Sequence, residues 1–137
     1  MIANSASDGA KLRVLVVDDS RDTADTIVSL LQHLGHEGHA SYDADSGLAA
    51  ALAFQPHLVL LDLEMPSKDG FALLRDLRKG TGAAKVPVVA LTGHADTAHR
   101  KEASEVGFDG YLVKPCGLEQ LRSVMRIVEL RGGAAQP

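Results

Sequence analysis

Short apolar runs alternate along the chain with longer segments in which hydrophobic residues recur at helical spacing. The runs predict strands at Leu12–Val17, Glu37–Tyr42, Leu58–Leu61, Val86–Leu91 and Tyr111–Val113. The first, third and fourth of them are nearly continuous Val and Leu, which is typical of strands buried on both faces of a parallel sheet. The second contains Gly38 and His39 and is therefore expected at an edge.

Amphipathic segments separate these runs and predict helices. They lie at Ala24–Leu34, after Asp45–Ser46, at Phe71–Leu77 with Asp69 as N-cap, at Asp96–Val106 and at Leu118–Val128. Strands that alternate with helices favour an α/β fold with right-handed crossovers. We predict a three-layer, doubly wound, five-stranded parallel sheet of flavodoxin-like (βα)5 type, in strand order 2-1-3-4-5.

The chain length of 137 residues fits one domain. We place this domain at residues 11–131, because residues 1–10 are small and polar and residues 132–137 are rich in Gly and Ala. Both ends are expected to be disordered tails.

Charge and composition narrow the class of function. The net charge of −4 argues against non-specific binding to nucleic acid or to acidic lipid. The single cysteine, Cys116, excludes an internal disulfide framework, and we expect it to be structural. No apolar run is long enough to span a bilayer, and Met1–Ala10 lacks the features of a secretion signal. The expected location is cytoplasmic.

Chemically active side chains follow the predicted strands where each one ends. They are Asp18 and Asp19 after the first strand, Asp62 after the third, Thr92 after the fourth and Lys114 after the fifth. Ligands of such sheets bind beyond the carboxyl ends of the strands. With strands about 4.8 Å apart, Lys114 lies about 10 Å from the third strand, a gap that a long side chain spans.

Three carboxylates that converge on one point repel each other, and a divalent cation removes that cost. Hard oxygen ligands favour Mg²⁺. On the other side, Lys114 and Thr92 suit the oxygens of an anion. A carboxylate nucleophile beside these groups indicates phosphoryl transfer to one of the aspartates, which would give an acyl phosphate.

Four motifs in chain order resemble one known family. They are Val16–Ser20, Leu61–Pro66 with Asp69–Gly70, Ala90–Gly93 and Gly110–Pro115. In sequence and spacing they are similar to the response-regulator receiver domain of two-component signalling, in the chemotaxis-regulator-like superfamily. The resemblance covers roughly Leu12–Leu130 and implies the same strand order as above.

The resemblance implies a phosphoacceptor and a metal site. Asp62 would accept the phosphoryl group. Asp19 would bind Mg²⁺ directly, Asp18 would contribute through a bound water, and the backbone carbonyl of Glu64 would complete the protein ligands, with Mn²⁺ as an alternative ion.

It also implies a switch. Lys114 would pair with Asp62 and then with a phosphoryl oxygen, across a cis Lys114–Pro115 peptide bond. Thr92 would move toward the phosphoryl group and Tyr111 would turn inward. The response would reach the surface of the fourth helix, fifth strand and fifth helix, with Arg100, Lys101, Tyr111, Arg122 and Arg126.

The implied partners are a histidine kinase or a histidine phosphotransfer protein as donor and a protein target on that surface. The domain would not act on a separate substrate but would catalyse its own phosphorylation and dephosphorylation. We expect a stand-alone regulator or a receiver module of a hybrid histidine kinase, without direct DNA or membrane binding.

Two side chains are candidates for setting the lifetime of the acyl phosphate, namely Glu64 and His94. In the family, the positions two past the phosphoacceptor and two past the Thr influence hydrolysis. Glu64 adds negative charge near the phosphoryl oxygens, and His94 could orient or impede a water. The sequence does not fix the direction of either effect.

Other interpretations are less favoured. An aspartate-nucleophile phosphatase would have its nucleophile in a D-x-D motif after the first strand, whereas Asp62 follows the third strand. A flavin or nucleotide site would need a phosphate-binding loop where Asp18 and Asp19 repel phosphate. A receiver-like module that acts by contact alone does not need the full acidic set. His33, His36 and His39 are interpreted as exposed residues and not as a metal site.

Overall fold

The computed structural model describes residues 11–65, 70–79, 85–93, 101, 105 and 107–135. Its strands are β1 (Arg13–Val17), β2 (Glu37–Ser41), β3 (Leu58–Asp62), β4 (Val88–Thr92) and β5 (Gly110–Val113). Its helices are α2 (Arg21–His33), α3 (Ala44–Phe54), α4 (Gly70–Lys79) and α6 (Leu118–Ala135).

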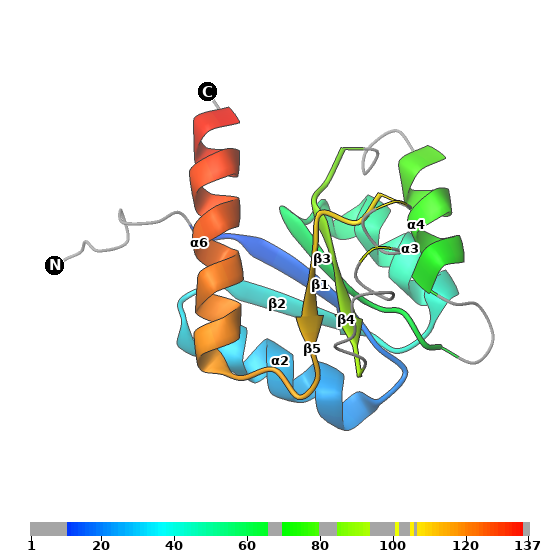
Figure 1. The fold of residues 1–137 in the computed structure, drawn as a ribbon, viewed down its shortest axis with the longest axis horizontal. Coiled ribbons are helices and arrows are strands. Elements are labelled where there is room, and N and C mark those ends of the chain that lie inside the picture. Colours follow the sequence, from blue (N-terminus) through cyan, green and yellow to red (C-terminus); the bar gives the residue numbers. More distant parts are fainter. Residues whose placement is uncertain are drawn as a thin grey trace, which may run out of the picture.

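The five strands form one parallel sheet in the order β2-β1-β3-β4-β5 (Figure 1). Helices α2 and α6 cover one face, and α3 and α4 cover the other. The predicted fold class and strand order are confirmed. The strands β1, β3 and β4, whose sequences are nearly continuous Val and Leu, lie in the centre of the sheet.

Two apolar layers hold the helices to the sheet. On one side, Leu31 of α2 and Leu121 of α6 pack with Val16 of β1, and on the other, Leu74 of α4 packs with Leu61 of β3. All five side chains are almost completely buried. In β2 exposed and half-buried residues alternate, which fits the edge position predicted from Gly38 and His39.

Helix boundaries differ from the predictions at two points. Helix α3 begins at Ala44 and not after Asp45–Ser46, because the carboxylate of Asp43 accepts a hydrogen bond from the Ser46 N–H at 2.8 Å and caps the helix. The backbone of α6 continues to Ala135, beyond the expected end of the domain at residue 131. The helix therefore runs through residues 132–135, which belong to the segment expected to be a disordered tail.

Some predictions fall on residues that the structure does not describe. These are the tail at 1–10, the N-cap Asp69, most of the helix at Asp96–Val106 and the last two residues of the chain. Among the helices of the described part, none combines the length and the apolar character needed to cross a membrane.

His36 is buried and not exposed, so that interpretation was wrong. Its Nδ1 accepts a hydrogen bond from the Leu12 N–H at 3.1 Å, and its Nε2 lies 3.6 Å from Oε2 of Glu129 on α6. The imidazole therefore supplies a hydrogen-bond partner to a backbone group at the start of β1. His33 and His39 are exposed, as expected.

Candidate functional site

The register of the sheet brings the predicted site residues to one edge. Val17 is level with Leu61, so Asp18 follows β1 where Asp62 ends β3. Asp62 is level with Leu91, and Thr92 with Val113, so that Lys114 extends one residue further. The carboxyl ends of β1, β3, β4 and β5 therefore meet at a common point.

Three carboxylates form a cluster there. Asp18, Asp19 and Asp62 each place a carboxylate oxygen so that all three atoms lie within 4.8 Å of one another. Asp18 is fully buried and Asp62 is 1% exposed, whereas Asp19 is exposed. Two carboxylates of the cluster are thus buried and the third lies at the surface.

Local hydrogen bonds orient two of these carboxylates. Oδ1 of Asp18 accepts a hydrogen bond from the Ser20 N–H at 2.9 Å, and Ser20 in turn caps α2 by accepting from the Thr23 N–H. Oδ1 of Asp62 accepts a hydrogen bond from the Glu64 N–H at 3.0 Å. These bonds fix one oxygen of each buried carboxylate.

Lys114 reaches into the cluster from β5. Its Nζ lies 2.9 Å from Oδ2 of Asp18 and 3.3 Å from Oδ1 of Asp62. The Lys114 N–H also donates to the Thr92 carbonyl at 2.7 Å, and the following peptide bond to Pro115 is cis. The contact with Asp62 agrees with the expected pairing, but sequence reasoning missed the closer contact with Asp18. Only the length of the lysine side chain pointed to such a reach.

The electrostatics of Asp62 follow from its burial. Burial raises the pKa of Asp62 from 3.8 to about 6, and the negative charge of Asp18 acts in the same direction. The Glu64 N–H and Lys114 oppose this shift. Burial by itself would lower the pKa of Lys114, but Asp18 and Asp62 outweigh it and raise that pKa. The lysine is therefore charged and the cluster is unfavourably negative.

The chemistry of the cluster fits a divalent cation. Oδ2 of Asp18 is buried and makes no hydrogen bond of regular geometry within the described residues; its contact is the ion pair with Lys114. A buried carboxylate oxygen without a full set of partners is costly. The donors are all hard oxygens, which suit a cation such as Mg²⁺ or Mn²⁺ and not a soft metal.

The other predicted residues are only partly placed. Thr92 ends β4 and is 2% exposed, Tyr111 is half-buried on β5, and Glu64 is exposed. His94 lies outside the described residues, as does Arg100 of the expected output surface. Of the remaining residues of that surface, the basic ones are exposed: Lys101, Arg122 and Arg126.

The comparison with known protein families decides the classification. The profile of the response regulator receiver domain matches residues 14–126 of this chain. The chain belongs to this family. The resemblance carried by the four motifs is confirmed, and the acidic cluster lies in the part that matches.

Individual relatives agree with this receiver assignment. The chemotaxis protein CheY4 of Vibrio cholerae has 29% sequence identity and a TM-score of 0.81, over 87% of this chain and 99% of that one. The receiver domain of the sensor histidine kinase PA1611 of Pseudomonas aeruginosa PAO1 has 25% identity and a TM-score of 0.77, over 86% and 97% of the two chains. That domain holds a magnesium ion in its active-site cleft.

A transcriptional regulator is also similar to this receiver domain. The DNA-binding dual master transcriptional regulator RpaA of Synechocystis sp. is 32% identical over 114 residues, which are 83% of this chain and 47% of that protein. The chain spans about half the length of the curated relatives it matches.

Cys116 lies beside the receiver site but takes no part in the cluster. It is half-buried, and burial raises the pKa of its thiol. A protonated thiol is a weak nucleophile and a weak ligand. This agrees with the structural role expected from sequence.

Proposed function

We propose that this receiver domain accepts a phosphoryl group on Asp62 from a histidine kinase or a histidine phosphotransfer protein, in a reaction that depends on Mg²⁺. Receiver domains are phosphoacceptor switches of two-component signalling. The observation that carries the proposal is the buried Asp62 carboxylate, which lies in one cluster with Asp18, Asp19 and the ammonium group of Lys114.

In the proposed transfer, a carboxylate oxygen of Asp62 attacks the phosphorus of the donor. The new P–O bond forms as the P–N bond of phosphohistidine breaks, and the electron pair returns to the imidazole. Oδ1 is held by the Glu64 N–H and Lys114, so Oδ2 is the oxygen we assign to the attack. Lys114 then follows a phosphoryl oxygen, and the Thr92 hydroxyl donates a hydrogen bond to another.

Asp18, Asp19 and Asp62 are the side chains that would hold the cation, with the backbone carbonyl of Glu64. Bound there, Mg²⁺ would offset the carboxylate charge and stabilise the charge on the phosphoryl oxygens. The magnesium ion in the similar PA1611 domain supports the choice of ion. Asp19 is the exposed member, which suits a direct ligand that exchanges with solvent.

The output side of the proposal concerns β5 and α6. The half-buried Tyr111 lies level with Ala90, near the strand that ends in Thr92. A movement of Thr92 toward the phosphoryl group would open space for the ring of Tyr111. The exposed Lys101, Arg122 and Arg126 would then present a changed surface to a protein target.

Intact mass spectrometry tests the acceptor. The domain is incubated with a small acyl-phosphate donor and Mg²⁺. We expect one added phosphoryl group on the wild type and on Asp45→Asn, an exposed acidic control on α3, and none on Asp62→Asn or after chelation of Mg²⁺. An adduct on Asp62→Asn would contradict the proposal. So would a wild type that gains no adduct and does not bind beryllofluoride.

We also propose that Glu64 and His94 set the lifetime of the acyl phosphate. The exposed Glu64 follows the Asp62 strand, and its backbone already contacts Asp62. The dephosphorylation rates of Glu64→Ala and His94→Ala test this role. Two rates equal to that of the wild type would contradict it.

A further inference from the structure

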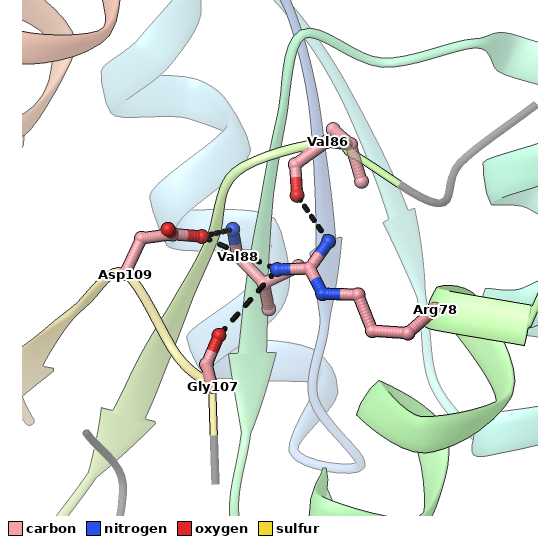
Figure 2. Close-up of polar contacts among 5 residues, drawn as sticks. All are labelled: Arg78, Val86, Val88, Gly107 and Asp109. Atoms are coloured by element: carbon pink, nitrogen blue, oxygen red, sulfur yellow. Dashed lines mark hydrogen bonds and ion pairs between the residues drawn. The ribbon is translucent and has the colours of Figure 1, made fainter. Parts of the chain in front are cut away.

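A second polar network lies at the opposite end of the sheet from the acidic cluster. Nη1 of Arg78, near the end of α4, donates a hydrogen bond to the Val86 carbonyl at 2.6 Å (Figure 2). Its Nη2 lies 3.3 Å from Oδ2 of Asp109 and 3.5 Å from the Gly107 carbonyl. We call Arg78, Val86, Val88, Gly107 and Asp109 the Arg78 clamp.

Asp109 forms hydrogen bonds with both the N–H and the carbonyl of Val88, the first residue of β4. Its N–H donates to the Val88 carbonyl at 2.8 Å, and its Oδ2 accepts from the Val88 N–H at 2.8 Å. The same Oδ2 faces Arg78. Asp109 directly precedes β5, so this double contact sets where β5 begins to pair with β4.

The rest of β5 specifies its register weakly. The strand runs only from Gly110 to Val113, lies at the edge of the sheet and pairs on one side with β4. Leu112 is its only buried residue. A strand with little burial on either face is prone to slip, so contacts at its ends carry more of the register.

The register of β5 decides where Lys114 lies. Lys114 follows Val113, and its Nζ contacts Asp18 and Asp62 from there. A slip of one residue would move it by about 3.3 Å along the strand and turn its side chain to the other face of the sheet. Both ion pairs would then be lost.

We propose that Arg78 and Asp109 are positioning residues for Lys114: the Arg78 clamp fixes the register of β5 and thereby the reach of the lysine into the phosphorylation site. This inference rests on the proposed function. Neither residue touches the reacting atoms, so both act through Lys114. The sequence signal for them is slight, an arginine in the last turn of a helix and an aspartate just before a strand.

The rate of phosphorylation by a small acyl phosphate at saturating Mg²⁺ tests the proposal. We expect Asp109→Ala and Arg78→Met to slow the reaction about tenfold or more, since small displacements of a catalytic group are costly. Asp109→Asn keeps an acceptor for the Val88 N–H and is expected to recover much of the rate. Arg75→Met changes an exposed arginine one turn earlier on α4 and should match the wild type.

Two readouts separate positioning from a general loss of structure. The clamp variants should bind Mg²⁺ at least as tightly as the wild type, because Asp18, Asp19 and Asp62 follow β1 or end β3, and displacement of Lys114 removes a competing positive charge from them. In a Lys114→Ala background, Asp109→Ala should slow the reaction no further. An equal additional loss in that background, or an unchanged rate for Asp109→Ala, would overturn the inference. If Asp109→Ala does not fold, the same comparison with Arg78→Met decides.

The proposed function and this inference fail in different ways. A wild type that is never phosphorylated contradicts the former. In that case hydrogen exchange at the Lys114 amide, which donates to the Thr92 carbonyl, still tests the clamp. Exchange should be faster in Asp109→Ala and Arg78→Met than in Arg75→Met, and equal exchange would refute the register role.

Discussion

Replacing Asp62, the proposed phosphoacceptor, by its neutral isostere asparagine should stabilise the metal-free domain. The side chain of Asp62 is 1% exposed, and its burial raises the pKa from 3.8 to about 6. In Asp62→Asn the amide oxygen can still accept the Glu64 N–H at the position that Oδ1 occupies. The substitution therefore removes an unfavourable buried charge while keeping a hydrogen bond.

The size of the effect follows from linkage. A carboxyl group whose pKa is raised in the folded state binds its proton more tightly there, so stability falls as the pH rises from 3.8 through about 6. At about 1.4 kcal/mol for each pH unit, the full cost above this window is about 3 kcal/mol. This is a large part of the 5–15 kcal/mol (roughly) that stabilises a typical domain.

Urea unfolding in a buffer with a chelator measures this cost. At pH 7.5 we expect Asp62→Asn to be up to about 3 kcal/mol more stable than the wild type, with an unchanged denaturant slope. Asp45→Asn, an exposed residue of α3, should differ by less than about 0.5 kcal/mol. The advantage of Asp62→Asn should shrink as the pH falls from about 6 toward 4, where the carboxyl of the folded wild type is already protonated.

Mg²⁺ should reduce the stability advantage of Asp62→Asn. An ion that binds only the folded protein adds about 2.7 kcal/mol at one hundred times its dissociation constant. The wild type keeps all three carboxylates and should gain more than Asp62→Asn, which keeps two. The reasoning is refuted if Asp62→Asn is equal to or less stable than the wild type without metal, or if their difference does not depend on pH.

Three further predictions concern stability and reactivity. Burial lowers the pKa of His36, so this residue should reduce the free energy of unfolding as the pH falls below about 6.5. His36→Asn keeps an acceptor for the Leu12 N–H and should lose less stability between pH 7 and 5 in urea titrations, and the same dependence on pH as in the wild type would contradict this. Gly70→Ala should lose about 1–3 kcal/mol despite the higher helix propensity of alanine, since a Cβ there would lie 2.5 Å from the Asp62 carbonyl oxygen. Gly93→Ala is the control, because the nearest atom to a Cβ there is Oε1 of Glu64 at 4.0 Å, and equal stability of the two variants would refute the packing argument. Cys116 should react with iodoacetamide at pH 8 more slowly than free cysteine, because burial raises its pKa, and a rate equal to that of free cysteine would contradict it.

The central part of the fold could be predicted because its signals are local. The Val and Leu runs of β1, β3 and β4 mark strands buried on both faces, and β2 with Gly38 and His39 marks an edge. Once the strand order is known, the site follows, because Asp18, Asp62 and Lys114 directly follow or end their strands. The predicted start of α3 was wrong because Asp43 and Asp45 are both possible N-caps, and it is Asp43 that accepts the capping hydrogen bond from Ser46.

What could not be predicted depends on contacts between distant residues. His36 is buried because its imidazole accepts from the N–H of Leu12, 24 residues earlier in the chain. Lys114 contacts Asp18 as well as Asp62 because the two carboxylates converge, and no spacing in the sequence shows this. Arg78 and Asp109 are 31 residues apart, and each is an ordinary surface residue until the sheet brings them together.

The most direct test of the central claim is to locate the phosphoryl group. After incubation with Mg²⁺ and a small acyl phosphate, borohydride reduction converts a phosphorylated aspartate to homoserine, which peptide mass spectrometry assigns to one position. We predict conversion at Asp62 in the wild type, with Asp18 and Asp19 unchanged. Conversion at either of those residues with Asp62 unmodified would contradict the account.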